Sequence, residues 1–142
     1  MSNIKIWIHA IWETKNRNPL LTIPIRKVLL QHILEYASGK GIQIEAINGH
    51  TEHVHCLFSL PSIFSCAEVM QILMDESSFW LNKNFKLPTK LEWTDDYIAV
   101  SISESMKDAM KSYILNQKDY HQKKVYAEEY DEIILKYGFQ KL

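Results

Sequence analysis

Hydrophobic and polar positions along the chain follow two periods, one typical of strands and one typical of helices. Strands are expected at residues 4–12, 42–48, 53–60 and 97–103. Helices are expected at residues 24–38, 65–84, 105–117 and 127–137. Ser65 and Glu68 have the spacing of a capping box at the start of the second helix, and Gly39 and Gly138 stand where helices end.

This order of elements, βαββαβ followed by helices, predicts the α+β class. The expected architecture is a ferredoxin-like βαββαβ antiparallel sheet that carries two helices on one face. Additional C-terminal helices follow, and one of them bears Tyr113. No internal repeat, low-complexity tract or linker divides the sequence, so residues 1–142 are expected to form a single domain.

The strand expected at 53–60 carries two histidines on one side. Its even positions, beginning with Val54 and Cys56, are apolar, so period two sends them to one face and sends His53 and His55 to the other. The two imidazoles then stand about 6.5–7 Å apart along the strand, close enough to share one metal ion. Imidazole binds several transition metals, so the pair does not name the metal. Two surface histidines on a half-exposed sheet are an equal alternative.

Tyr113 and Gln117 are four residues apart on the helix expected at 105–117, so they share a face. Ala109, Met110 and Ile114 can supply the apolar stripe of that helix, which leaves Tyr113 and Gln117 to one side. A core tyrosine beside a surface glutamine is the alternative. Spacing alone does not decide between a site and ordinary packing.

The amino-acid composition does not decide whether the protein binds nucleic acid. The 142 residues are 46% hydrophobic and 23% charged, as in an ordinary globular protein. The net charge of −1 argues against nucleic acid, because phosphate contacts come from lysine and arginine. The charges are segregated, however, with lysines crowded between 107 and 124 and acids between 128 and 132. Without a visible signal peptide, a membrane-length apolar stretch or a disulfide framework, a cytoplasmic protein is expected.

Five segments spread along the chain share the layout of one known family. They are IWIHAIWETKNRNPLL at 6–21, EHVHCLF at 52–58, SSFWLNK at 77–83, WTDDY at 93–97 and YILNQKDYHQKK at 113–124. Together they resemble the single-tyrosine HUH transposases of small bacterial insertion sequences and their REP-associated relatives. The second and the last segment match the family's D/E-H-V-H-hydrophobic and Y-I-x-N-Q-x-x-H-H motifs, and the resemblance covers nearly the whole chain.

The resemblance implies a DNA strand transferase that needs a divalent metal and no ATP. His53 and His55 match the two HUH ligands, and Gln117 matches the third ligand, for Mg²⁺ or Mn²⁺. Tyr113 would attack phosphorus, leaving a 5′-phosphotyrosyl link and a free 3′-OH that can reverse the step and rejoin strands. The implied partner is single-stranded DNA with a hairpin, bound by a homodimer that associates with the nucleoid.

DNA contacts are expected from basic residues near the nucleophile and in the opening segment. The candidates are Lys118, His121, Lys123, Lys124, Lys15 and Arg17. Trp12, Trp80 and Trp93 are expected in the core, His9 as a hydrogen-bonded structural residue, and His32 with His50 at the surface.

Three departures from the family pattern support an alternative function. Met74, Asp75 and Glu76 stand where the family commonly has a basic residue, DDYIAV replaces a glycine-containing strand, and Tyr120 replaces the first histidine of the last motif. The alternative is a catalytically inactive or domesticated DNA-binding or regulatory protein on the same fold. Retention of Tyr113 and the ligands favours the enzyme.

Overall fold

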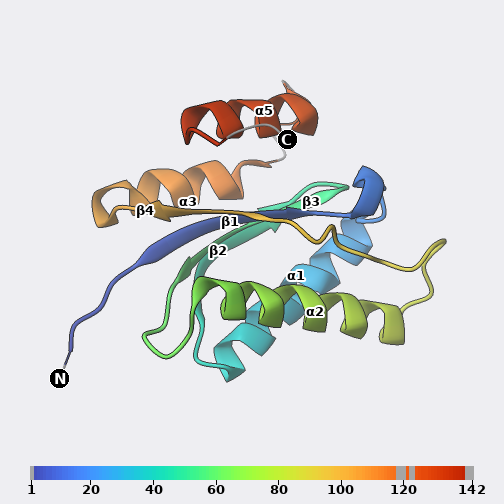
Figure 1. The fold of residues 1–142 in the computed structure, drawn as a ribbon. Helices are drawn as coiled ribbons and strands as arrows, with labels where there is room; N and C mark the ends of the chain where they lie inside the picture. Colours follow the sequence, from blue (N-terminus) through green and yellow to red (C-terminus); the bar gives the residue numbers. More distant parts are fainter. Residues whose placement is uncertain (1, 118–120, 122–123, 140–142) are drawn as a thin grey trace.

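The computed structural model describes residues 2–117, 121 and 124–139. Four strands form one antiparallel sheet in the order β2-β3-β1-β4 (Figure 1). They are β1 (Trp7–Glu13), β2 (Gln43–Gly49), β3 (His53–Ser59) and β4 (Ile98–Ile102). With the helices between them, the strands give the predicted ferredoxin-like βαββαβ arrangement of the α+β class.

Helices cover both faces of the sheet, as Figure 1 shows. On one face lie α1 (Ile23–Gly39) and α2 (Cys66–Asn84), and on the other lie α3 (Lys107–Leu115) and α5 (Tyr126–Lys136). The short 3-10 turns η1 (Lys15–Arg17) and η2 (Glu104–Met106) follow β1 and β4. The Ser65–Glu68 capping box predicted for α2 is present, with both of its hydrogen bonds. No helix among the described residues is long and apolar enough to span a membrane.

The alternation along β3 divides the molecule into two layers. Val54, Cys56 and Phe58 belong to the main hydrophobic core under α1 and α2. His53, His55 and Leu57 face α3 and α5, as period two predicted. The expected place of the tryptophans in the core is confirmed: Trp12 is buried there, and Trp80 and Trp93 pack against it.

The layer of α3 and α5 has two small apolar clusters instead of one large core. Beneath α5, Ile11 and Ile98 of the sheet meet Tyr126, Ile133 and Ile134. Beneath α3, Trp7, Ala46 and Leu57 of the sheet meet Ile114 of the helix. The indole Nε1–H of Trp7 also donates to Glu104, and the Lys107 ammonium lies 5.1 Å from the centre of a Trp7 ring.

Tertiary contacts explain two of the element ends that differ from the sequence prediction. The first strand begins at Trp7, three residues after the expected start at Ile4, because its partners begin there: Trp7 pairs with Ser59 on one side and with Ile102 on the other. The helix expected to reach Gln117 ends at Leu115, whose carbonyl accepts a hydrogen bond from Asn48 Nδ2 at 3.1 Å. Tertiary contacts therefore set both ends.

His32 was expected at the surface, and that prediction is wrong. Its ring stacks on Trp80, with centroids 3.9 Å apart and planes 5° apart, and its Nε2 lies 2.7 Å from Glu76. The half-buried ring thus joins α1 to α2. Glu76, one of the residues of α2 that depart from the family pattern, thus has His32 as a structural partner. Met74, which departs from the same pattern, is part of the main core.

Candidate functional site

The two histidines of β3 lie on the face that α3 and α5 cover, and each is held by a neighbour. His53 Nδ1 donates to Glu52 Oε1 at 2.6 Å. His55 Nδ1 is 2.9 Å from Nε2 of His9, which lies on the adjacent strand β1. His9 is thus the hydrogen-bonded structural histidine that the sequence predicted. These contacts orient both rings so that each Nε2 faces the interior of the layer.

Tyr113 and Gln117 reach the same place from α3 and from the residues just after it. The ring of Tyr113 meets that of His55 edge-on, with centroids 5.6 Å apart. Gln117 Oε1 lies 3.3 Å from His53 Nε2, and Gln117 Nε2 lies 3.5 Å from the Tyr113 carbonyl. The structure therefore brings together the four residues that the resemblance singled out, although Gln117 lies beyond the last residue of α3.

Glu129 of α5 stands at the centre of this group. Its Oε1 is 3.4 Å from His53 Nε2 and 3.2 Å from His55 Nε2. Its Oε2 accepts a hydrogen bond from the Tyr113 hydroxyl and lies 3.4 Å from Gln117 Nε2. Two β3 histidines, the tyrosine and the glutamine thus all converge on one carboxylate.

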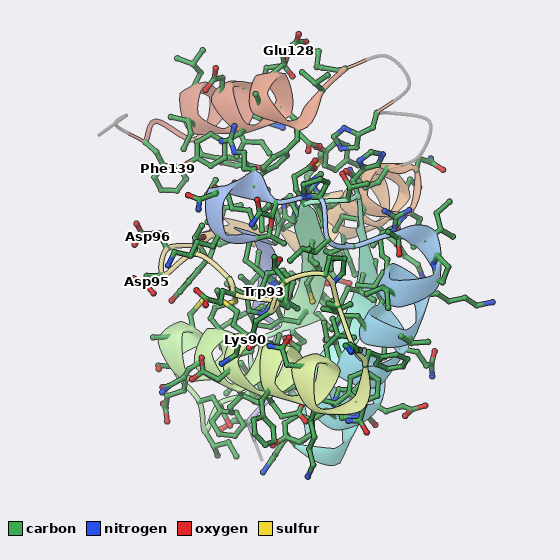
Figure 2. The ribbon with its side chains drawn as sticks, turned by 90° about the vertical axis from the view of Figure 1, so that its right-hand side faces the viewer. Lys90, Trp93, Asp95, Asp96, Glu128 and Phe139 are labelled. Atoms are coloured by element: carbon green, nitrogen blue, oxygen red, sulfur yellow. The ribbon has the colours of Figure 1, made fainter. Side chains whose placement is uncertain are left out.

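Sequence reasoning missed Glu129 because it stands in a run of acids. Glu128 points away from the sheet on the outer side of α5 (Figure 2), whereas Glu129 is only 1% exposed. One signal was available: Glu129 is three residues after Tyr126 and four before Ile133, both buried. A charged residue on the buried stripe of a helix calls for a specific partner.

The donor set fits a divalent metal. The ligand atoms of His53, His55 and Glu129 all lie within 4.8 Å of one another, and all three residues are buried. Imidazole nitrogen with carboxylate oxygen is a common first-row metal set. Gln117 Oε1, at 3.3 Å from His53 Nε2, can add a neutral oxygen. Because each β3 histidine has its Nδ1 occupied by a partner, its Nε2 is the nitrogen that would bind the ion.

Burial shifts the pKa values of the cluster in different directions. It lowers the pKa of His55 to about 4 and that of His9 to about 3. Burial also opposes charge on His53, but hydrogen bonds to Glu129 and Glu52 outweigh it and raise the pKa of His53. Burial would raise the pKa of Glu129, yet its contacts with three histidines hold it well below the usual range. At neutral pH a carboxylate therefore faces the neutral ring of His55, which favours a bound cation.

Two further histidines extend the cluster. His121 Nε2 lies 2.9 Å from Gln117 Oε1 and 3.4 Å from Glu129 Oε1. The structure thus places His121 beside the candidate ligands, and its expected DNA contact stays a prediction. His50 was expected at the surface, which is wrong: it is half-buried, with its ring centre 4.7 Å from that of His121.

The basic residues expected to contact DNA are placed unevenly. Lys15 is exposed and paired with Glu92 at 3.3 Å. Arg17 lies over the rings of Tyr126 and Tyr130, 5.1 and 5.2 Å from their centres, and so packs against α5. Lys124 is paired with Glu132. Lys118 and Lys123 lie outside the described residues, and DNA contacts of all five residues remain predictions.

The site is closed in this conformation. His53, His55 and Gln117 are each 0% exposed. The ring of Tyr126 stacks on that of His53 with centroids 3.9 Å apart, so α5 covers the cluster. A cavity of about 300 Å³ between α3 and α5 borders the site and is lined by residues that include Tyr113, Glu129 and His9. A larger cavity of about 830 Å³ lies elsewhere, between α2 and the loop that carries Lys90 and Trp93 (Figure 2).

The sequence shows the family to which the chain belongs. A family profile described as "Transposase IS200 like" matches residues 2–117. That match spans most of the chain, so the protein belongs to the family of IS200-like transposases, which places it among proteins that cut and rejoin DNA. A comparison with curated proteins finds no match.

Solved structures show the same fold. A presumed transposase from Deinococcus radiodurans R1 has a TM-score of 0.67 and 23% identity, covering 82% of this chain and 93% of the other. A REP-associated tyrosine transposase bound to a REP hairpin has a TM-score of 0.61 and 17% identity, covering 85% of this chain and 74% of that one. At these identities the likeness establishes the architecture, and the chemistry has to be argued from the residues of this chain.

Proposed function

We propose that the protein nicks and rejoins single-stranded DNA in a metal-dependent reaction that passes through a 5′-phosphotyrosine on Tyr113. One observation carries the proposal: within a single chain, the hydroxyl of Tyr113 stands in the same buried cluster as His53, His55 and Gln117, joined to it through Glu129. A tyrosine next to a group of converging ligand atoms is what attack on a phosphodiester needs.

The nicking step exchanges one phosphate ester for another. Tyr113 Oη attacks phosphorus, a Tyr113–phosphate bond forms, and the bond to the 3′-oxygen breaks. In the closed state Glu129 Oε2 accepts the hydrogen bond from this hydroxyl. When α5 has moved and DNA is bound, the phenol proton passes to water, and the departing 3′-oxygen takes a proton from water. The reverse step, attack by a 3′-OH on the phosphotyrosine, rejoins strands without ATP.

His53, His55 and Gln117 would hold the divalent metal, and Glu129 would add its carboxylate in the closed state. When bound, such an ion polarises the scissile phosphate and offsets the charge that develops on its oxygens. Glu52 and His9 fix the two β3 rings from behind. The family resemblance suggests Mg²⁺ or Mn²⁺.

DNA reaches this site only after α5 moves. The scissile phosphate must approach both Tyr113 Oη and the ligand atoms of His53, His55 and Gln117. These residues are buried, and Tyr126 and Glu129 of α5 lie against them. The cavity between α3 and α5 marks the boundary along which the two helices separate. The enzyme therefore has a closed resting state and an open DNA-bound state.

The REP-associated neighbour is bound to a hairpin, so we propose single-stranded DNA with a hairpin as the substrate of this protein too. We also propose a homodimer, on the resemblance to family members that act as dimers.

The test is formation of a covalent adduct. The protein is incubated with 3′-labelled single strands taken from the DNA that flanks its gene, with Mn²⁺, with Mg²⁺ or with EDTA. The label is expected to move to the protein in denaturing gels when metal is present, and to be lost in Tyr113→Phe. Tyr36→Phe, a tyrosine of α1 on the other side of the sheet, is the matched control and is expected to keep full activity.

A binding protein without catalysis is the second candidate. It is favoured by the closed site, in which His53, His55 and Gln117 are buried. Strands that bind equally well to the wild type and to Tyr113→Phe, with no adduct under any metal condition, would establish this candidate and reject the enzyme.

A further inference from the structure

We propose that the cavity between α3 and α5 takes one unpaired nucleobase of the DNA strand, from a nucleotide next to the scissile phosphate. His9 donates a hydrogen bond to this base from Nδ1. The proposal rests on the proposed function and assigns a contact to a neighbouring part of its substrate. It begins from a buried nitrogen, His9 Nδ1, for which the described residues supply no hydrogen-bond partner.

The other ring nitrogen of His9 determines where its proton lies. Nε2 of His9 is 2.9 Å from His55 Nδ1. When His55 binds the ion through Nε2, its own N–H is on Nδ1 and donates to His9 Nε2. Burial disfavours a charged ring, and a neutral imidazole has a single N–H. His9 therefore carries its N–H on Nδ1.

This Nδ1–H is a buried donor that the described part of the chain leaves unpaired. The His9 ring is only 2% exposed, so bulk water does not satisfy it in the closed state. Buried donors without an acceptor are costly and call for an explanation. Because Nε2 is turned to His55, Nδ1 lies on the other side of the ring, and His9 lines the cavity. An acceptor that enters the cavity can meet this donor.

The walls of the cavity suit a flat, largely apolar group. They include Met106, Ala109 and Met110 of α3 and Ile133 and Tyr137 of α5. Apolar side chains and an aromatic ring pack well against the face of a base. The volume of about 300 Å³ is at the lower end of small-molecule sites, which suits a group as small as one nucleobase.

The charges that line the cavity favour a base over a phosphate. Glu129 and Glu132 contribute two carboxylates, whereas Lys136 contributes one ammonium. Two carboxylates beside one cation repel a phosphate. The same carboxylates can accept hydrogen bonds from the amino group of a base, while His9 donates to one of its ring or carbonyl acceptors. The cavity therefore matches the mixed polar edge of a nucleobase.

Tyr113 determines which base enters the cavity. Its ring also lines the cavity and meets the His9 ring edge-on, with centroids 6.2 Å apart. The base therefore belongs to a nucleotide that adjoins the phosphate attacked by Tyr113. His9 stays in place when α5 moves, because β1 is paired with β3 on one side and with β4 on the other. Movement of α5 thus opens the cavity and leaves its floor intact.

Strands with single abasic positions test the proposal. Fluorescent single strands from the DNA that flanks the gene are bound to full-length protein in EDTA, so that no nick forms, with each nucleotide in turn made abasic. At one position, loss of the base is expected to weaken binding to the wild type by about 10–100-fold. That position is expected to be one of the two nucleotides that flank the nick, which is mapped from the Tyr113 adduct formed with Mn²⁺.

Two variants remove the two features of the cavity. In His9→Gln, the amide oxygen can accept from His55 Nδ1, but no donor takes the place of His9 Nδ1. In Ala109→Phe, the added ring fills the cavity. Both variants are expected to bind the intact strand about 10–100-fold more weakly than the wild type does. The abasic position that weakens wild-type binding should change their affinity by less than about threefold.

Two controls separate loss of the base contact from general damage. Ser112→Phe adds the same ring at an exposed position of α3 that does not line the cavity, and it is expected to bind both strands like the wild type. Calorimetry with Co²⁺, a probe for imidazole sites, is expected to give the same affinity for His9→Gln and the wild type, because His55 keeps its partner. Equal losses of Co²⁺ and strand affinity in His9→Gln would overturn the base contact.

Failure of this proposal is distinct from failure of the enzyme. If the Tyr113 adduct forms but no abasic position depends on His9 and Ala109, the nicking function stands and the base contact is rejected. A dependent position away from the nick would likewise overturn the proposal. If one position depends on both residues but no metal yields an adduct, the base contact stands in a protein that only binds DNA, and nicking is rejected.

Discussion

At the scale of single residues, Glu52 offers a sharp test of how the site is built. Its carboxylate touches no expected ligand atom but accepts the Nδ1–H of His53 at 2.6 Å. We expect Glu52→Gln to weaken Co²⁺ binding by about 10–100-fold, because the ring loses its charged anchor. Calorimetry with Co²⁺ measures the change.

Glu92→Gln is the matched control for Glu52→Gln, since Glu92 is exposed and paired only with Lys15 among the contacts described above. Its Co²⁺ affinity should equal that of the wild type. Equal losses in both variants would mean that overall charge, and not the orientation of His53, governs metal affinity.

The residues of the site differ in how far the sequence revealed them. His53 and His55 were placed together by strand alternation, which needs no knowledge of the rest of the fold. Tyr113 and Gln117 came from a motif. His121 belongs to the same motif, and the structure places it beside Glu129. Glu129 was not assigned to the cluster in advance, because its position depends on how α5 returns to the sheet.

At the scale of elements, α5 is held by a small apolar cluster and not by the main core. Ile134 is 6% exposed and packs in this cluster, while its neighbour Leu135 is 79% exposed. We expect Ile134→Ala to lower the free energy of unfolding by about 2 kcal/mol, because a buried side chain leaves a cavity. Leu135→Ala should change it by less than about 0.5 kcal/mol.

Urea unfolding followed by circular dichroism measures both variants. Loss of packing under α5 should also speed amide hydrogen exchange in α5 more than in α1 or α2, since the site opens through this helix. If Ile134→Ala speeded amide exchange equally in α1, α2 and α5, the result would contradict an α5 that opens by itself.

Periodicity and capping predicted where the helices and strands lie. Some of their ends, however, depend on tertiary contacts. The Ser65–Glu68 capping box placed the start of α2 correctly from four residues of sequence. The end of α3 could not be read in this way, because Asn48, far away along the chain, binds the Leu115 carbonyl. Likewise His32 lacked any sequence signal of its stacking on Trp80, which requires two helices to pack.

At the scale of the whole molecule, all described parts of the site come from one chain. Tyr113 reaches Glu129, His55 and Gln117 of its own chain. In a homodimer that keeps these contacts, each chain carries a complete site. We expect co-expressed Tyr113→Phe and His55→Ala chains to form no more DNA adduct than either variant alone.

The two chains carry different affinity tags, so that mixed dimers can be isolated before the labelled strand is added. Wild-type dimers purified in the same way must give the adduct. Recovery of activity in the mixed dimer would show that the tyrosine of one chain serves the histidines of the other.

The sheet also divides the four tryptophans of the chain three to one. Trp12, Trp80 and Trp93 lie with the main core, whereas Trp7 is buried beside α3, bonded to Glu104 and close to the Lys107 ammonium. An indole emits differently when a neighbouring charge moves or water arrives. In a variant that keeps Trp7 as its one tryptophan, the emission of Trp7 would therefore follow motions on the side of the sheet that carries the site, without any added label.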